Sequence, residues 1–482
     1  MLDVLILGAG ITGCAIARVL SRYDLSVAVA DAADDVAMGA SRANSAIVHA
    51  GYDCKPGSAM ARMNVEGNRL YDAWCDDLNV PLGRCGSLVL AFSEEEMETV
   101  RELYDFGIKN GVPDMRILGA EETHAQQDNL SAEVVGSLYA GTGGITCPYE
   151  LTQACARAAA LNGVAFHLGW RAVSAEKGAD CLTIVNDKGE RLQARYVVNA
   201  AGVYADDVAR MVGDDSFAIT ARRGEYLLLD RASGAQVYTV LFQTPGPMGK
   251  GVLVSPTVDG NSFAGPTAVD QDDKEDTSVS QDGIDELRRL SRRTMPSYPI
   301  HKTITSFSGL RAVSSTGDFV LGASGAEPRM LHAAGISSPG LTSAPAIAEH
   351  IAACLTEAGL PMREKTSYTK RLPRHKAFRN MTDAERAAAI AENPLHARII
   401  CRCEMVTEAE IIEAIHRAPG ATSIDGVKRR TRAGMGRCQG GFCSPRVMAI
   451  IARELNIPME SITKFGGGSS MLVGKLRKED AQ

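Results

Sequence analysis

Four cysteines near the C-terminus have the type and spacing of a ligand set: Cys401, Cys403, Cys438 and Cys443. They form a C-x-C pair and, 34 residues later, a C-x4-C pair that ends a glycine-rich stretch. Four thiolates that converge on a loop-rich module can hold an iron–sulfur cluster or a zinc ion. Structural zinc sites usually draw on C-x2-C to C-x4-C knuckles, so the C-x-C pair favours the cluster and leaves zinc as the alternative.

The N-terminal segment has the pattern of a dinucleotide site. An apolar run is followed at once by a G-x-G-x-x-G turn with Gly8, Gly10 and Gly13, and the next apolar run ends at Asp31. Such glycines allow a tight turn, close approach of a pyrophosphate and close packing of helix on strand. The helix N-terminus favours the phosphate charge, and Asp31 is placed to accept a hydrogen bond from a ribose hydroxyl. The motif by itself fits FAD and NAD equally.

Two later segments favour FAD. One is a predicted strand that ends in small residues, among them Ala201 and Gly202, which would let a cofactor lie against the backbone. The other is a turn that enters a helix over 344–355, whose N-terminus could stabilise negative charge on a reduced flavin. The candidate cofactor contacts in this turn are Gly335, Ser338, Gly340, Leu341 and Thr342.

Length and composition indicate a globular protein with more than one domain. The chain has 482 residues, of which 45% are hydrophobic and 23% charged, and two or three domains are expected. A net charge of −7 gives no general reason to expect nucleic-acid binding. Twelve scattered cysteines fit free thiols plus one ligand set in a reducing compartment. Without a signal-peptide pattern or an apolar run of about 18 residues, we expect a cytoplasmic protein with no integral membrane segment, and peripheral membrane association stays open.

Composition also divides the chain. The expected units are a large N-terminal part over 1–365, a linker over 366–395, a cysteine module over 396–456 and a tail over 457–482. In the cysteine module, Thr407 and Glu410 form a capping-box signal for a helix over 408–417. Ser444 followed by proline predicts the start of a second helix, over 446–455. The cysteine pairs therefore lie in loops that flank helices.

Several segments resemble a known flavoprotein family. Ser41, Asn44 and Ser45 belong to the stretch SRANSAIVHAGY, which resembles the second flavin-contact region of the D-amino-acid-oxidase-like (DAO) flavoproteins. Its best match is the glycerol-3-phosphate oxidase/dehydrogenase branch. Further matches in the expected order are RRGEY at 222–226, GKGVLVSP at 249–256, GPTA at 265–268, SGLR at 308–311 and the turn at 338–345. L-2-hydroxyglutarate oxidases share much of the first signature, so that stretch alone does not name a substrate.

The resemblance implies an α/β fold, with a Rossmann-like FAD-binding domain interleaved with an antiparallel β-sheet substrate domain, plus a small helical iron–sulfur module. The cysteine module resembles the bacterioferritin-associated-ferredoxin-like (BFD-like) domain, which carries a [2Fe-2S] cluster. The same fusion occurs in the large subunit of anaerobic glycerol-3-phosphate dehydrogenases. It implies oxidation of sn-glycerol-3-phosphate to dihydroxyacetone phosphate, with electrons passing from FAD through the cluster to partner subunits, a second flavoprotein among the candidates. The alternatives are a 2-hydroxy acid or amino acid as substrate, and an oxidase with a zinc-bearing docking module.

The resemblance also suggests roles for individual residues. His49, which it places beside the flavin, is the candidate base for the hydroxyl proton; a core histidine or a covalent flavin attachment are the alternatives. Arg311 has a planar fork that fits a phosphate or a carboxylate. Lys250, between two glycines, could add a second charge or a mobile donor, and Arg223 is a further substrate-side candidate. The catalytic candidates are thus His49, Arg311 and Lys250, and for each cation the alternative is a solvated surface charge.

A basic run, 428–432, precedes the second cysteine pair. Cations near a thiolate-ligated cluster should favour its reduced state. We expect this run either to raise the cluster potential or to dock an acidic partner face, with a solvated basic helix face as the alternative.

Overall fold

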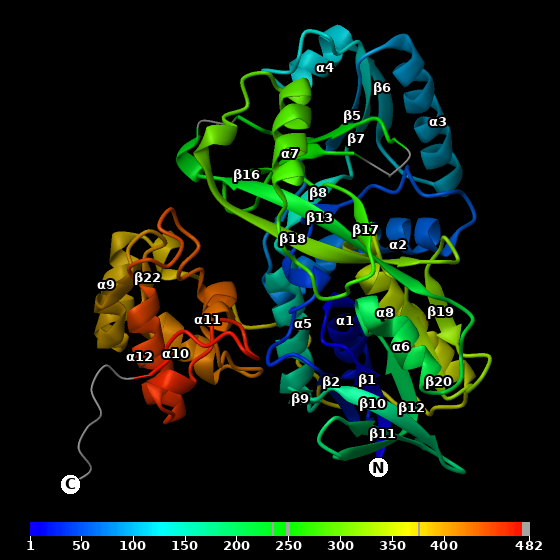
Figure 1. Ribbon diagram of the computed structural model, residues 1–482, viewed down its shortest axis with the longest axis vertical. Helices are drawn as coiled ribbons and strands as arrows, with labels where there is room; N and C mark the ends of the chain where they lie inside the picture. Colours follow the sequence, from blue (N-terminus) through cyan, green and yellow to red (C-terminus); the bar gives the residue numbers. More distant parts are fainter. Residues whose placement is uncertain (234–235, 247–250, 375, 475–482) are drawn as a thin grey trace.

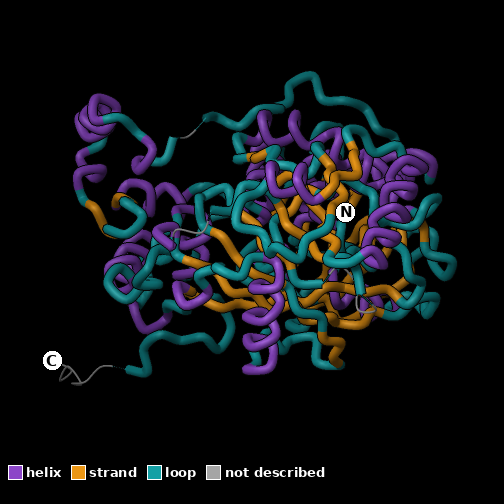
Figure 2. Tube along the Cα trace, turned by 90° about the horizontal axis from the view of Figure 1, so that it is seen from above, coloured by secondary structure: helices purple, strands orange, loops and turns teal. Residues whose placement is uncertain are grey.

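The computed structural model describes residues 1–233, 236–246, 251–374 and 376–474. Two large sheets form the main body, and helices α9 to α12 form a separate module at its side (Figure 1). Viewed from above, the strands gather in the main body, whereas the module is mostly helix and loop (Figure 2). The predicted α/β architecture with a small helical module is therefore confirmed.

The first sheet contains the dinucleotide-binding pattern. β1 pairs in parallel with β2 and β12, and β12 pairs in parallel with β20. The carboxyl ends of these strands meet at one edge, where the strands of such α/β sheets place ligands. Its strands in spatial order are β10 (Ala172–Lys177), β11 (Leu182–Asn186), β12 (Arg191–Asn199), β1 (Leu2–Leu7), β2 (Val27–Asp31) and β9 (Ala165–Leu168), with β20 (Met330–Ala334) and β19 (Val320–Ala323) joined to β12.

The second sheet covers that edge. It is antiparallel except for one parallel pair, β5 with β14, so the predicted antiparallel substrate sheet is in fact mixed. Its order is β17 (Val269–Gln271), β13 (Ile219–Leu229), β16 (Ser262–Gly265), β15 (Leu253–Pro256), β14 (Val240–Gln243), β5 (Ser87–Ala91), β7 (Gly136–Ala140) and β6 (Met115–Gly119), with β18 (Thr303–Ser314) on the other side of β13.

Helices and two small sheets complete the fold. The small sheets are β3 (Ile47–Val48), β8 (Gly144–Thr146) and β4 (Leu82–Gly83), and β21 (Ile399–Cys401) with β22 (Val406–Thr407). The helices are α1 (Ile11–Leu20), α2 (Ala59–Leu78), α3 (Glu94–Asn110), α4 (Ala120–Gln126), α5 (Pro148–Leu161), α6 (Ala205–Arg210), α7 (Gln281–Thr294), α8 (Gly340–Glu357), α9 (Asp383–Glu392), α10 (Glu408–His416), α11 (Ile424–Thr431) and α12 (Ser444–Leu455). Within the described residues, no helix is long and apolar enough to span a bilayer.

Two glycines of the first motif hold β1, α1 and β12 together. Gly8 has a φ of +114°, and a Cβ there would lie 2.2 Å from the carbonyl oxygen of Ala200. A Cβ on Gly13 would lie 1.9 Å from the carbonyl oxygen of Gly8. A side chain at either position would push the helix away from the strands, so the predicted close packing is real.

The two predicted helices of the cysteine module are present. Thr407 and Glu410 form both hydrogen bonds of the capping box that starts α10, and α12 begins at Ser444. Ile411, Val427 and Ile451 are buried in the core of the module. The segment predicted as a linker, which joins the main body to this core in the sequence, contains α9, none of whose residues is buried, whereas Leu372 and Phe378 of the same segment are buried.

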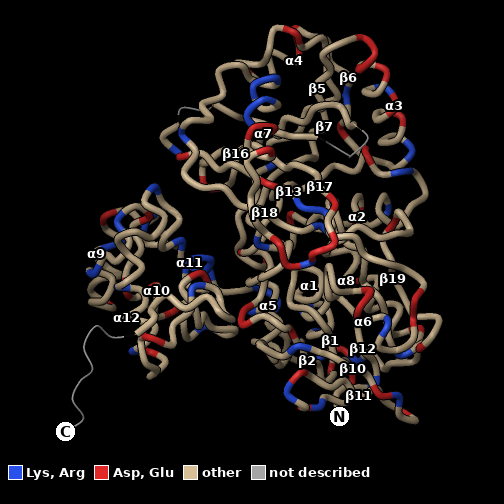
Figure 3. Tube along the Cα trace, in the orientation of Figure 1, with Lys and Arg blue, Asp and Glu red and all other residues tan. Residues whose placement is uncertain are grey.

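The module is attached to the main body by buried ion pairs. Asp35, fully buried, accepts hydrogen bonds from Arg429 at 2.9 Å and from Arg430 at 2.6 Å. These basic residues lie on α11, which faces the main body (Figure 3). The interpretation of the basic run as a partner-docking or solvated face is therefore wrong for both arginines, because they neutralise an aspartate of the same chain.

A second buried carboxylate links the cysteine loop to the second sheet. Glu404, next to Cys403, accepts hydrogen bonds from Arg432 at 2.9 Å, from Arg379 at 3.0 Å and from Arg231. Arg231 lies just after β13, so the loop of the first cysteine pair is fixed to the main body as well. Removing one partner of such a buried pair leaves an uncompensated charge, which costs about 3–5 kcal/mol.

Candidate active site and cysteine centre

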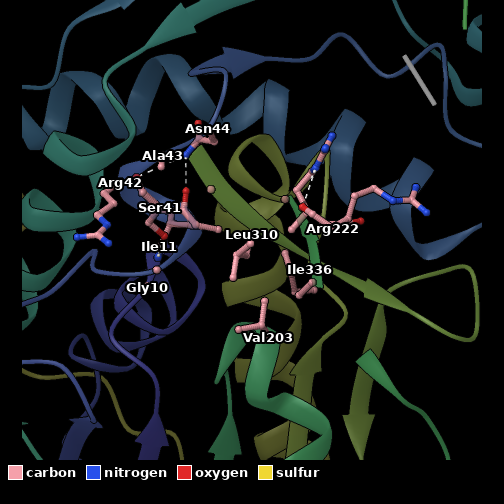
Figure 4. A pocket seen from close by; sticks show the side chains of 18 of the residues that line it. Gly10, Ile11, Ser41, Arg42, Ala43, Asn44, Val203, Arg222, Leu310 and Ile336 are labelled. Carbon is pink, nitrogen blue, oxygen red and sulfur yellow. Dashed lines mark hydrogen bonds between the residues drawn. The ribbon is translucent and has the colours of Figure 1, made fainter. Parts of the chain in front are cut away.

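A cavity of about 1250 Å³ lies where the carboxyl ends of β1, β2, β12 and β20 meet β13 and β18. It is larger than the common 300–1,000 Å³ of small-ligand pockets and so has room for a dinucleotide. Figure 4 shows Gly10, Ile11 and Ser41 on one side of it, with Leu310, Ile336 and Arg222 toward the other. The two sides differ in chemistry.

The first side is built for a nucleotide. The N–H of Ile11 donates to Ser41 Oγ at 2.8 Å, which joins the start of α1 to the segment after β2. The Asp31 carboxylate accepts from the N–H of Ala9 at 2.6 Å and of Ala33 at 2.8 Å. Burial raises the pKa of Asp31, and these two amides counteract that effect. The carboxylate is thereby fixed in the cavity wall, where a ribose hydroxyl could donate to it.

Most of the predicted cofactor residues line this cavity. They are Gly8, Gly10, Asp31, Ser41, Asn44, Ser45, Ala201, Gly202, Ser338, Gly340 and Leu341. Gly13, Gly335 and Thr342 do not. Gly13 packs behind Gly8, and Gly335 is in a turn with a φ of +66°. The Thr342 hydroxyl accepts from the N–H of His49 at 2.9 Å. Gly13 and Thr342 therefore contact the lining residues Gly8 and His49 without lining the cavity themselves.

The second side carries groups suited to alcohol oxidation. His49 lines the cavity, with its Nε2 3.3 Å from the Ser338 hydroxyl and its ring 5.8 Å from that of Phe242. Gly340, the first residue of α8, lines the same region. The positive end of that helix can therefore stabilise negative charge that develops there.

Arg311 is a cation without a carboxylate partner in the described residues. Its Nη2 donates to the carbonyl oxygens of Thr267 at 2.6 Å and Arg223 at 3.2 Å, and its Nε lies 3.4 Å from that of Arg222. Nη1 has no hydrogen bond within the described chain. Burial lowers the pKa of Arg311, yet a guanidinium remains charged in proteins. The structure thus offers a fixed, unneutralised charge in the cavity wall.

The predicted Arg223 and Lys250 do not join this site in the same way. Side chains alternate along a strand, and in β13 Arg222 lines the cavity while Arg223 does not. The Arg223 guanidinium donates instead to Asp276 at 2.6 Å, and lies 3.6 Å from the buried Glu225. Lys250 lies outside the described residues.

The cavity wall also contains residues that the sequence did not mark as site candidates, among them Arg222, Tyr226 and Phe242. The Tyr226 ring stacks on Phe307 at 4.8 Å between ring centroids. Arg222 and Tyr226 lie four positions apart on one strand, so period-two alternation was the signal that could have placed them on the same face.

The matched pair of arginines gives a direct test of this alternation. Arg222→Gln should raise the KM for an anionic substrate severalfold. The effect is smaller than for a free cation, because the Arg222 guanidinium also donates to the Asp270 carboxylate, at 2.8 Å from Nη2. Arg223→Gln should leave KM within about twofold and lower Tm instead, because it strips a partner from Asp276 and Glu225. Steady-state kinetics and thermal melts of both variants check this; a larger KM effect for Arg223→Gln would contradict it.

The four cysteines of the ligand set lie in one region as two pairs. Cys403 Sγ and Cys438 Sγ are 3.7 Å apart. A hydrogen bond from Cys443 lowers the pKa of Cys401 to about 6. Burial would raise the pKa of Cys438, but the N–H groups of Phe442 and Gly440 lower it below its ordinary value.

The donor set fits a thiolate-ligated group, although its sulfurs are not arranged around one point. Among the described residues, no group of three or more His, Cys, Asp and Glu side chains has metal-binding geometry. Amide N–H groups aimed at a sulfur stabilise a thiolate, and such bonds accompany iron–sulfur clusters. The chemistry of the loop therefore agrees with a cluster.

Known protein families match both the main body and the cysteine module. Residues 3–354 match the family model "FAD dependent oxidoreductase" (DAO), and residues 399–453 match "BFD-like [2Fe-2S] binding domain". A glycerol 3-phosphate dehydrogenase of Caloramator mitchellensis is 44% identical over 482 residues, which covers 99% of this chain and 100% of the relative. A glycerol 3-phosphate oxidase of Mycoplasma genitalium is 33% identical and covers 72% of this chain and 93% of the relative.

A solved structure shares the fold of the main body. The L-alpha-glycerophosphate oxidase of Mycoplasma pneumoniae with FAD bound aligns with a TM-score of 0.74 at 30% identity, over 77% of this chain and 99% of that one. The fold and cavity define an FAD-dependent oxidoreductase with a [2Fe-2S] domain. The chain belongs to the DAO family, in its glycerol-3-phosphate dehydrogenase/oxidase branch. Its cofactors are FAD and a [2Fe-2S] cluster.

Proposed function

We propose that this protein is a dehydrogenase that oxidises sn-glycerol-3-phosphate to dihydroxyacetone phosphate. The observation that carries the proposal is the unneutralised Arg311 guanidinium in the same cavity as His49. An anion and a secondary alcohol in one molecule fit that pair. Likeness to the Caloramator mitchellensis glycerol 3-phosphate dehydrogenase over nearly the whole chain, including the cysteine module, supports the choice of substrate and of a dehydrogenase.

The residues of the cavity then have distinct roles in the first half-reaction, in which the substrate reduces FAD. Nη1 of Arg311 binds the phosphate. Arg222, directly opposite Arg311 in the β13–β18 pair, lines the same cavity, but its charge is offset by the Asp270 carboxylate, to which its Nη2 donates at 2.8 Å. His49 Nε2 accepts the hydroxyl proton, while Ser338 holds the ring in place through its 3.3 Å contact. Bound FAD supplies the hydride acceptor. Lys250 remains a candidate donor that the described residues do not place.

The cysteine module handles the second half-reaction. Cys401, Cys403, Cys438 and Cys443 would hold the cluster, which supplies one-electron transfer when bound. Electrons would leave to a partner subunit, for which a second flavoprotein in the cytoplasm is the candidate. The buried ion pairs of Asp35 and Glu404 fix the module against the main body for this transfer.

An anaerobic titration of the purified holoenzyme with glycerol-3-phosphate tests the proposal. Flavin and cluster absorbance are followed together, and iron and zinc are assayed on the same sample. We expect flavin bleaching with parallel loss of cluster absorbance. No bleaching by glycerol-3-phosphate would reject the substrate, and zinc without iron would reject the electron-transfer role of the module.

A 2-hydroxy acid is the second candidate substrate. The mouse mitochondrial L-2-hydroxyglutarate dehydrogenase is 28% identical over 54% of this chain, which is a shorter and weaker match. Arg311 would bind a carboxylate as readily as a phosphate. The same titration with L-2-hydroxyglutarate separates the two, because bleaching by this acid alone would favour the second candidate.

A further inference from the structure

The C-terminal part of the chain contributes a ring to the FAD cavity. Phe465 lines the cavity, and among the described residues it is the only lining residue that follows Leu341 in the sequence. We propose that Phe465 is an FAD-binding residue, and that docking of the cysteine module therefore closes the ADP side of the flavin site. FAD retention and module docking are then linked.

A tight turn over residues 463–469, here called the C-terminal turn, presents this ring. The carbonyl oxygens of Thr463 and Lys464 accept from the N–H groups of Ile424 at 3.2 Å and Asp425 at 2.8 Å, at the start of α11. The N–H of Phe465 donates to Ser469 Oγ at 3.0 Å. The turn is thus fixed to the start of α11 by backbone hydrogen bonds.

The C-terminal turn also contacts the main body directly. Gly466 has a φ of +88°, and a Cβ there would lie 2.5 Å from Cγ of Asp34. The Arg42 guanidinium lies 5.9 Å from the centre of the Phe465 ring, within the range of a cation–π contact. The ring is held between the module and the segment that follows β2.

That segment is the wall on the ADP side of the cavity. Its lining residues are Ala32, Ala33, Met38, Gly39, Ala40, Ser41 and Arg42. Asp31 begins it, where a ribose hydroxyl is expected to bind. The module contacts the segment a second time, through the ion pairs of Arg429 and Arg430 with Asp35 and the 3.0 Å contact of Arg429 Nη2 with Met38 Sδ.

Arg42 indicates which part of FAD lies here. It has no carboxylate within ion-pair distance among the described residues, and burial together with the charge of Arg429 lowers its pKa. A half-buried cation without an acidic partner, beside the start of α1, suits a pyrophosphate. The Phe465 ring lies within cation–π range of this guanidinium and would cover the adjoining ADP group when FAD is bound.

The test measures release of FAD from the holoenzyme after dilution, by the rise in flavin fluorescence. Phe465→Ala should release FAD about tenfold faster, equivalent to about 1.4 kcal/mol. Phe465→Tyr, which keeps the ring, should match the unaltered protein. The matched control is Phe442→Ala, because Phe442 is 86% exposed in the cysteine loop and does not line the cavity. Equal release rates for Phe465→Ala and Phe442→Ala would overturn the proposal.

A second measurement on the unaltered protein needs no variant. Because coupling between two binding events is reciprocal, removal of FAD should loosen the module. Limited proteolysis within 366–395 should then become several-fold faster in the FAD-free protein, with iron content unchanged. Cleavage at the same rate with and without FAD would refute the link between FAD and the module.

Discussion

Arg311→Gln is expected to lower kcat/KM for glycerol-3-phosphate by about 10²–10³. The guanidinium is held by backbone carbonyls, so its Nη1 is already oriented for an anion before substrate arrives. Truncating one partner of a buried, hydrogen-bonded charge pair costs about 2–5 kcal/mol, and every 1.4 kcal/mol is a factor of ten. Steady-state kinetics with an artificial electron acceptor measure the loss.

Two controls separate substrate binding from general damage. FAD content and chemical reduction of the flavin by dithionite should not change in Arg311→Gln, because the proposed loss concerns the substrate. Arg311→Lys keeps a charge but not the planar fork and should recover only part of the activity. A kcat/KM for Arg311→Gln within threefold of the unaltered protein would remove Arg311 from the substrate site.

Cys443→Ala is expected to remove the cluster while it leaves oxidation of the substrate intact. Cys443 is buried beside Cys401, and loss of one of four thiolates should lower bound iron about tenfold or more. The flavin half-reaction should stay within about twofold, because His49 and Arg311 lie in the main body. Iron analysis, cluster absorbance and anaerobic single-turnover reduction of the flavin are the measurements.

The chain offers a matched thiol outside the module. Cys181 is a half-buried free cysteine of the main body, and Cys181→Ala should change neither iron nor cluster absorbance. Full iron content in Cys443→Ala would exclude this thiol as a ligand. Loss of substrate-driven flavin reduction in the same variant would mean that the module has a part in the first half-reaction.

Local signals predicted the cofactor units well. The G-x-G-x-x-G turn, the acid that ends β2 and the capping box at Thr407 each lie within a short stretch of chain, and the structure contains all three. Their physics is local, because a tight turn, a helix start and a strand end are decided by neighbouring residues. The two cysteine pairs could be recognised for the same reason, because the members of each pair are close together in the sequence.

The sequence predicted less well those features that depend on which way a side chain or a helix faces. Arg222 and Arg223 are adjacent in the sequence, and the pleat of β13 alone puts the first in the cavity wall and the second against Asp276. The basic run of α11 predicted an effect on the cluster potential or a partner-docking face, with a solvated face as the alternative, yet Arg429 and Arg430 pair with Asp35, nearly 400 residues away. Neither outcome follows from residue type.

The sequence by itself therefore determined a dinucleotide fold and a set of paired cysteines, and it named a histidine and several cations as candidates for the substrate site. The tertiary structure alone decided which cation lines the cavity, where the module docks and that Phe465 reaches the flavin site. The physical reason is the distance along the chain over which each kind of interaction acts. Turns, caps and ligand spacing are set within a few residues, whereas strand facing and domain docking are set by burial and ion pairing between distant segments.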